Sequence, residues 1–446
     1  MFKRLLFISL HNLYDFRFYK TYKSLLKSQW KSYKDLKCEQ KKKLRKIIKF
    51  SYNNIPYYHK LFNKLKIQPN NIKRIKDLEQ LPILKKETIK EKWGEFIPKK
   101  LDKIKYINRT TSGSTGSPLK YRITKFDRIL HWAVMYASWG YANYKLGDKV
   151  VVLGGPSVMP STQSKIKELV YRIFRNFVYL SSYDMEDSNI KKYVDIINNL
   201  KPKIGYGYAG AWYLLAKFIE KHNLKIYSPK AIFTSAEKLF PEMRKKIEDV
   251  LKTEVYDSYG LNDGGISAFE CSEHKGLHIN TERALLEVVD DNGKQLREGP
   301  GRILATSLYN YAMPFIRYDT GDLGYALDEF CPCGRGYRLL REVTGRQLEF
   351  LISPEGKKIY GGFFSHMLRD IGEVKEFQVV QEKVDEITIR INPEENFDKR
   401  QLQFIRKAVK KRSNNWKVKF EMSDEFEKTI AGKYKFIINN LGNNGE

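Results

Sequence analysis

The chain contains no run of apolar residues long enough to cross a membrane as a helix. It has only four cysteines in 446 residues, and a single residue separates Cys331 from Cys333, which is a poor arrangement for a disulfide framework. Repeats of fixed period and low-complexity linkers are also missing. These absences argue against a membrane-spanning or disulfide-stabilised secreted protein. They indicate a soluble protein of the cytoplasm.

Acidic residues are scarce relative to basic ones. The sequence has 52 Asp and Glu against 81 Lys and Arg, so its formal net charge is +29. Such an excess suits nucleic acid, an anionic membrane surface or a polyanionic substrate. The basic residues are spread along the chain in short, distant clusters, however, and no nucleic-acid-binding signature accompanies them. We therefore expect no specific nucleic-acid partner.

The first ten residues, MFKRLLFISL, combine basic and apolar side chains but run on without a small-residue cleavage site. They are predicted to form an amphipathic helix that packs on its own domain. Peripheral contact with a membrane through this helix is the alternative.

The length of the chain exceeds what one hydrophobic core supports, so more than one domain is expected. Residues 1–100 are predicted to be mostly helical. Beyond them, β-branched runs at 149–155 and 203–207 alternate with helical patterns such as 188–200. This alternation is typical of a large α/β domain with a mainly parallel sheet, in which ligands bind at the carboxyl ends of the strands.

The last hundred residues change character. Alternating apolar residues on either side of 383–386 predict a β-hairpin, and a helical pattern over 402–409 follows. We therefore divide the chain into an N-terminal domain, 1–345, and a small C-terminal α+β domain, 346–446.

Residues 110–118 read TTSGSTGSP, a run in which hydroxyl side chains alternate with glycines. Glycine lets the backbone approach an anion closely, and successive N–H groups and hydroxyls can bind phosphate oxygens. No Lys-Ser or Lys-Thr follows Gly116, so the run differs from the common P-loop. The pattern predicts either a phosphate-binding loop or a flexible surface loop.

An ordered set of further motifs follows this run. They are TSAEK at 234–238, YDSYGLNDGG at 256–265, FIRYDTGDLG at 315–324, Gly345-Arg346, and TIAGKYKF at 429–436. In these motifs and their order the chain resembles the adenylate-forming superfamily, and within it the phenylacetate-CoA ligase-like proteins of the CapK-like branch, which is associated with capsular polysaccharide clusters. The resemblance extends from Thr110 to Phe436.

The resemblance implies an enzyme that uses ATP and Mg²⁺ to convert a carboxylic acid to an acyl-AMP with release of pyrophosphate. Acyl transfer to CoA would follow, and the small C-terminal domain would be mobile. Direct transfer to an amine or hydroxyl of a polysaccharide precursor is an alternative. A second alternative is an inactive relative that binds polyanions or membranes. The sequence does not identify the acid.

The resemblance also assigns residues to these tasks. Lys433 would stabilise the charge that builds as pyrophosphate leaves, and Asp263 would hold Mg²⁺ where the family usually carries Glu. Leu348 stands at the usual hinge Asp, which leaves the acyl acceptor open. The implied cofactor-binding residues are Thr111, Ser112, Gly113, Ser114, Thr115 and Gly116 at the phosphates, Ser235, Ala236, Glu237, Asp257, Ser258, Tyr259 and Gly260 at the adenine and acyl group, Asp322 at the ribose, and Arg346.

Cysteine and histidine form a separate constellation. Cys271 opens the segment CSEHKGLH, and Cys331 and Cys333 lie in CPCG sixty residues later. Three thiolates and one imidazole make a closed tetrahedral zinc site. We predict structural zinc at these cysteines with His278, the position that also matches the family, and His274 is the alternative fourth ligand. Buried cysteines without a metal are the other interpretation.

Overall fold

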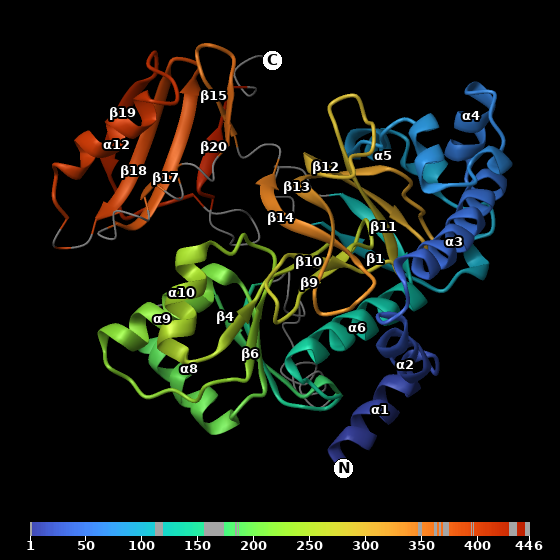
Figure 1. Ribbon diagram of the computed structural model, residues 1–446, viewed down its shortest axis with the longest axis horizontal. Coiled ribbons are helices and arrows are strands. Elements are labelled where there is room, and N and C mark those ends of the chain that lie inside the picture. Colours follow the sequence, from blue (N-terminus) through green and yellow to red (C-terminus); the bar gives the residue numbers. More distant parts are fainter. Residues whose placement is uncertain are drawn as a thin grey trace. The chain divides into compact units, whose positions relative to one another are not determined.

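The computed structural model (Figure 1) describes residues 2–111, 119–155, 174–182, 185, 187–346, 350–360, 364, 367–368, 374–393, 395, 397–427 and 435–441. The chain forms two compact units. The first takes in most of the chain up to Val343, and the second takes in most of it from Thr344 on, with short additions from the first part. Within the described residues, no helix combines the length and apolar character needed to cross a bilayer.

The first hundred residues form helices joined by short turns. Ser32 caps the longest of them, because its side chain accepts a hydrogen bond from the backbone N–H of Asp35, and Pro56 opens the next one, where its missing N–H costs nothing. The α-helices are α1 Phe2–Tyr14, α2 Phe18–Ser28, α3 Tyr33–Asn54, α4 Pro56–Lys64 and α5 Lys86–Glu91, with 3₁₀ turns at Pro69–Asn71, Ile75–Gln80, Trp93–Phe96 and Leu101–Lys103.

A five-stranded, fully parallel sheet follows, with the strand order β4-β3-β5-β6-β7. Val150 and Val152 pack toward helix α6, whereas Val151 and Leu153 pack toward α8, α9 and α10, so helices cover both faces. The predicted strands and helices of this region are confirmed. Their bounds are α6 Lys125–Trp139 with a 3₁₀ turn at Gly140–Ala142, β3 Val150–Gly154, β4 Phe177–Ser181, α8 Asp187–Leu200, β5 Ile204–Gly207, α9 Ala209–Lys221, β6 Ala231–Thr234, α10 Pro241–Leu251 and β7 Glu254–Tyr256.

A seven-stranded sheet has the order β11-β12-β13-β14-β10-β9-β8. Its pairs β8–β9, β9–β10, β10–β14 and β11–β12 are antiparallel, so the sequence expectation of mainly parallel sheets holds only for the five-stranded sheet. One reason is local: Gly293, with φ +75°, lets the chain reverse tightly after β11, so that Val289 pairs with Gln295 in an antiparallel bridge before β12 begins. The strands are β8 Ser258–Gly260, β9 Ser267–Glu270, β10 Leu277–Ile279, β11 Ala284–Val289, β12 Gly299–Ser307, β13 Tyr318–Phe330 and β14 Arg338–Arg346, and a separate antiparallel hairpin consists of β1 Tyr106–Thr110 and β2 Lys120–Thr124.

The C-terminal unit is a small α+β fold. Its β17–β18 hairpin turns at Val384-Asp385, and α12 buries Ile405 and Val409 against the sheet, as the apolar spacing predicted. The sheet order is β19-β18-β17-β20, with β19 and β20 added in parallel. The elements are β15 Phe350–Ile352, β16 Lys358–Tyr360, β17 Val374–Lys383, β18 Glu386–Pro393, α12 Gln401–Lys410, β19 Lys417–Met422 and β20 Ile437–Asn439.

We predict that Gly207→Ala destabilises the N-terminal unit by more than about 2 kcal/mol. Gly207 ends β5 with φ +148°, and an added Cβ would lie 1.8 Å from the carbonyl oxygen of Leu153 in β3. Thermal or urea unfolding measures the loss. Gly94→Ala is the matched control, because nothing lies within 4 Å of its added Cβ, and equal stability of the two variants would contradict the prediction.

Candidate active site and metal centre

Two predicted site residues lie at the carboxyl edge of the parallel sheet. Ser235 directly follows β6, and its backbone N–H donates to the carbonyl of Gly207 at 2.8 Å. Asp257 directly follows β7, and its Oδ1 accepts from the Thr234 hydroxyl at 3.1 Å. Ala236 has φ +68°, a left-handed conformation that non-glycine residues rarely adopt outside constrained sites. The fold thus places these residues where α/β folds bind ligands.

Asp257 belongs to a partly buried ionic cluster that the sequence analysis missed. Its backbone N–H donates to Glu270 Oε2 at 2.8 Å, and Arg244 Nη2 donates to the same oxygen at 2.7 Å. Burial and the neighbouring Glu270 carboxylate raise the pKa of Asp257 from its ordinary 3.8 to about 7. His274 lies beside Arg244, with 3.0 Å between Nη1 and Nδ1. Asp257 therefore titrates near neutral pH.

The other predicted residues of these motifs make structural contacts or lie within a strand. Glu237 Oε2 accepts the backbone N–H of Gly210 at 2.9 Å, so its carboxylate caps the N-terminus of α9. Ser258 is buried and donates its hydroxyl to the carbonyl of Thr234. Tyr259 and Gly260 lie in β8. Their proposed place around the adenine and acyl group stays a prediction.

Arg283 is the centre of a second network that sequence reasoning missed. Its side chain is fully buried, and Nε and Nη2 donate to the two oxygens of Asp127 at 3.2 and 2.9 Å. Nη1 lies 3.1 Å from Nδ1 of His131, one helical turn after Asp127 on α6. Arg283 also approaches the carbonyl of Leu261 and the side chain of Asn262, both at 3.4 Å. The guanidinium therefore holds the loop that leads to Asp263.

Burial and the Arg283 charge lower the pKa of His131, so this histidine is neutral. Since Nδ1 accepts from Arg283, the proton resides on Nε2. The one signal in the sequence was the i, i+4 spacing of Asp127 and His131, and it gives no indication of an arginine 156 residues away.

Asp263, the predicted Mg²⁺ ligand, lies in the turn between β8 and β9 and is nearly buried. Its Oδ2 accepts from the Tyr318 hydroxyl at 3.0 Å, which ties it to β13. Burial and the Asp263 carboxylate raise the pKa of Tyr121 in β2, so the β1–β2 hairpin also approaches this turn. A carboxylate held between two sheets fits a cation at phosphate groups, although the role itself stays a prediction.

The predicted phosphate loop connects the two strands of this hairpin, β1 and β2. The backbone N–H of Thr111 donates to the carbonyl of Leu119 at 2.9 Å, and the N–H of Leu119 donates to the Thr111 hydroxyl at 2.8 Å. These two bonds close the base of the loop. The predicted residues Ser112, Gly113, Ser114, Thr115 and Gly116 lie outside the described residues.

The remaining predicted positions are divided between the strands and the undescribed part of the chain. Asp322 lies in β13 and is buried, and Arg346 is the last residue of β14. Lys433 and the hinge position Leu348 lie outside the described residues. Their roles stay predictions.

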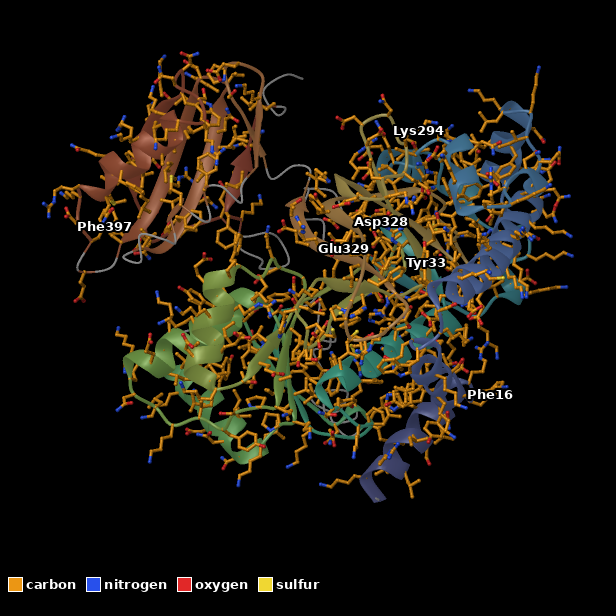
Figure 2. The ribbon with its side chains drawn as sticks, in the orientation of Figure 1. Phe16, Tyr33, Lys294, Asp328, Glu329 and Phe397 are labelled. Atoms are coloured by element: carbon orange, nitrogen blue, oxygen red, sulfur yellow. The ribbon has the colours of Figure 1, made fainter. Side chains whose placement is uncertain are left out.

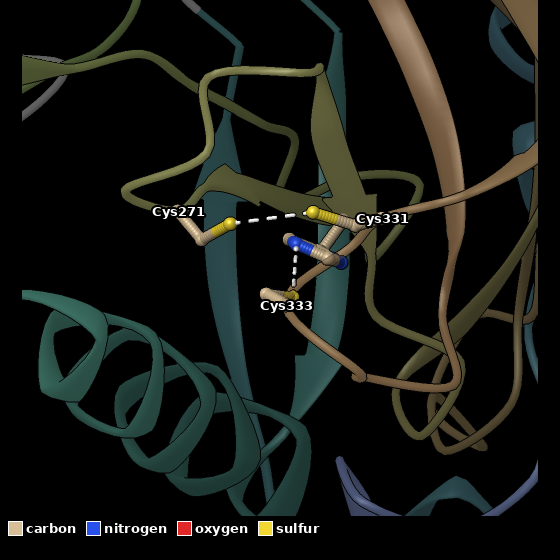
Figure 3. A group of neighbouring side chains, drawn as sticks. Cys271, Cys331 and Cys333 are labelled. Carbon is tan, nitrogen blue, oxygen red and sulfur yellow. Dashed lines mark hydrogen bonds between the residues drawn. The ribbon is translucent and has the colours of Figure 1, made fainter.

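Cys271, His278, Cys331 and Cys333 come together in one cluster, with all potential ligand atoms within 4.8 Å of one another. The Sγ atoms of Cys271 and Cys331 are 3.6 Å apart, and Cys333 Sγ lies 3.5 Å from His278 Nε2 (Figure 3). Tetrahedral zinc with ordinary bond lengths would separate two sulfurs by about 3.8 Å and a sulfur from a nitrogen by about 3.6 Å. The four residues therefore fit a divalent metal ion.

The strand order explains why these residues meet. Cys271 directly follows β9, His278 lies in β10, and the two other cysteines lie in the turn between β13 and β14. The strands β13, β14, β10 and β9 are successive neighbours in the sheet. Gly334, with φ +82°, closes the cysteine turn, and its N–H donates to the carbonyl of Cys331 at 3.2 Å.

Burial in the cluster affects the imidazole and the thiols differently. Burial and the Arg335 charge lower the pKa of His278 to about 4, which leaves the imidazole neutral and able to ligate. Burial raises the pKa of Cys271 and Cys331, which by itself disfavours their thiolate forms, so the positive charge of a bound metal would be needed to keep them deprotonated. His274, the alternative ligand, is not in the cluster, because it lies beside Arg244 and Glu270.

Comparisons with known proteins agree with this architecture. Residues 351–440 match the family described as the CapK C-terminal domain. The chain is 26% identical over 409 residues to Protein CapK of Staphylococcus aureus, covering 90% of this chain and 89% of that protein. It is 25% identical over 386 residues to a phenylacetate-coenzyme A ligase of Thermus thermophilus, covering 81% and 82%.

A solved structure shares the fold. The crystal structure of 2-hydroxyisobutyryl-CoA ligase in complex with 2-HIB-AMP gives a TM-score of 0.72 at 19% identity, covering 90% of this chain and 89% of that one. The chain is therefore similar in sequence, over most of its length, to ligases of the adenylate-forming type, and it shares their fold. Among those ligases it resembles Protein CapK and the phenylacetate-coenzyme A ligases, and its residues 351–440 match the CapK C-terminal domain.

We predict one zinc ion per chain at the Cys/His cluster. Cys331→Ser should lower both zinc content and thermal stability, because the metal joins segments far apart in the sequence and its binding free energy stabilises the fold. Metal analysis of protein purified without chelator gives the stoichiometry. His278→Ala should lose zinc and His274→Ala should retain it, whereas a stable wild-type protein with almost no metal would refute the site.

The raised pKa of Asp257 predicts a pH dependence of stability. Between about pH 4 and pH 7 the Asp257 carboxyl is ionised in the unfolded chain but protonated in the folded chain. The free energy of unfolding therefore falls as pH rises through this range, and the loss levels off above about pH 7. Asp257→Asn should therefore gain stability relative to wild type as pH rises through this window. Thermal unfolding across the range tests this, with the exposed Asp249→Asn as control; a constant difference between wild type and Asp257→Asn would contradict it.

Proposed function

We propose that the protein activates a carboxylic acid with ATP as an acyl-AMP, releases pyrophosphate, and transfers the acyl group to CoA. The observation that supports this most is the likeness to a phenylacetate-coenzyme A ligase over 81% of the chain, in the same chain that carries the site motifs in order. Asp257 and Asp263 lie at strand ends and turns of two sheets that the Arg283 network joins. We place the reaction in the cytoplasm, where ATP and CoA are supplied.

The chemistry needs positioning more than a protein base. The substrate carboxylate oxygen forms a bond to the α-phosphorus, and the bond from that phosphorus to the bridging oxygen of pyrophosphate breaks. Lys433 would stabilise negative charge as pyrophosphate leaves, and Asp322 would accept from the ribose hydroxyls. Mg²⁺, when bound, neutralises phosphate charge, and Asp263 is the residue that would hold it.

Two observations favour a second acceptor. The C-terminal residues 351–440 match the CapK C-terminal domain, and Protein CapK matches more of the chain than the phenylacetate-coenzyme A ligases do. Leu348 also stands where the hinge Asp is expected. Both points support transfer of the acyl group to an amine or hydroxyl of a polysaccharide precursor instead of CoA.

The proposal predicts pyrophosphate release that depends on one acid in a panel of carboxylic acids. Added CoA should speed turnover and yield a thioester; acid-dependent pyrophosphate release that CoA leaves unchanged would instead favour the other acceptor. Lys433→Ala should abolish acyl-AMP formation but keep ATP binding, since the lysine acts on charge that develops in the transition state. Asp322→Ala should also weaken ATP binding.

Lys435→Ala is the matched control, because Lys435 lies two residues away and pairs with Glu427 at 3.7 Å. It should keep full activity. Pyrophosphate release unaffected by Lys433→Ala would remove that residue from the mechanism. Polyanion binding with no ATP turnover for any acid would favour the inactive relative.

A further inference from the structure

Helix α1 is apolar on two opposite sides. Its inner side packs on the body of the N-terminal unit through Phe7 and His11, which are buried and one helical turn apart. The His11 ring lies between the rings of Phe7 and Phe174, with centroid distances of 4.0 and 4.2 Å. This contact agrees with the sequence prediction that the helix packs on its own domain.

The opposite side of α1 is exposed and also apolar. We call it the α1 outer face and define it as Leu5, Leu6 and Leu13, together with Phe16 in the turn to α2. These four side chains are 54%, 42%, 83% and 82% exposed. Figure 2 shows Phe16 at the outer edge of the N-terminal helices. A helix that is apolar on both sides normally has a second apolar surface to cover it.

The charges of residues 2–31 indicate what kind of surface would cover the α1 outer face. Between residues 2 and 31 one side chain is acidic, whereas the basic ones are Lys3, Arg4, Arg17, Lys20, Lys23, Lys27 and Lys31. The single acid, Asp15, is engaged locally, because its Oδ2 pairs with Arg17 at 2.6 Å. Lys20, Lys23 and Lys27 are exposed along α2, the helix that follows the outer face in the chain. An exposed apolar face followed by a helix with exposed lysines has the chemistry that the headgroups and acyl boundary of an anionic lipid bilayer attract.

We propose that the α1 outer face and the lysines of α2 bind an anionic membrane surface, with α1 lying in the plane of the headgroups. A helix of 13 residues is about 20 Å long, too short to span the hydrocarbon core, so an interfacial position is the one open to it. Leu13 and Phe16 enter the interface, and the lysines contact the headgroups. The proposal does not depend on the acid or the acyl acceptor.

The test is co-flotation of the full chain with lipid vesicles. Binding to phosphatidylcholine vesicles that contain phosphatidylglycerol is expected, with little binding to pure phosphatidylcholine and weaker binding at high salt. Leu13→Ser/Phe16→Ser should weaken binding by at least about tenfold, because it removes the inserted apolar side chains. Lys20→Glu/Lys23→Glu/Lys27→Glu should do the same through charge.

Matched controls separate this surface from general effects. Leu65→Ser/Phe404→Ser alters exposed apolar residues elsewhere, and Lys42→Glu/Lys245→Glu/Lys411→Glu reverses the same number of charges elsewhere. Both should bind vesicles nearly as wild type does. Unchanged thermal midpoints would show that the variants fold.

Three results would overturn the proposal. They are no binding of the wild type to anionic vesicles, equal binding by the Leu13→Ser/Phe16→Ser variant, and a concentration-dependent dimer that the same variant abolishes. The last result would mean that a second copy of the chain covers the outer face.

Discussion

The buried pairing of Arg283 with Asp127 is the constraint on which the N-terminal unit depends. A guanidinium removed from water is costly unless its donors are used, and here they reach Asp127, His131 and the loop before Asp263. Asp127 lies on α6, which covers one face of the parallel sheet, and Arg283 directly precedes β11 of the antiparallel sheet. Removing one partner would leave an unpaired buried charge, which typically costs about 3–5 kcal/mol. This buried ion pair thus links two sheets that share no strand.

The Cys/His cluster likewise joins segments that are distant in the sequence, here at β9, β10 and the turn between β13 and β14. The turn after Cys333 packs against the end of α2: Arg335 Nε donates to Gln29 Oε1 at 2.9 Å, and the N–H of Gly336 donates to the Gln29 carbonyl at 3.0 Å. An added Cβ on Gly336 would lie 1.9 Å from the carbonyl oxygen of Lys31, so only glycine permits this approach. A metal at the cluster would therefore fix the N-terminal helices as well as the strands.

These two features differ in how far the sequence could predict them. Three cysteines and a histidine are rare enough in this chain to be grouped by chemistry alone, and the structure brings together the four residues chosen. The parallel strands were predictable because a strand covered on both faces is a continuous β-branched run. Arg283 and Glu270 carry no comparable signal, since one charged residue among many shows its burial only after the fold exists. The antiparallel pairing likewise depends on tight turns such as that at Gly293.

The residues that stabilise the N-terminal unit are largely different from those proposed to take part in the chemistry. The hydrophobic clusters around α6 and α9 hold the layers together, whereas the residues proposed to meet the nucleotide, such as Asp257 and Asp263, contact polar neighbours. Burial and the Glu270 carboxylate together raise the pKa of Asp257, and the Tyr318 hydroxyl orients the Asp263 carboxylate. A substitution in the apolar clusters should therefore mainly lower the free energy of unfolding. One in the polar networks changes the geometry or protonation of the site in a chain that still folds, and so acts first on ligand binding and turnover.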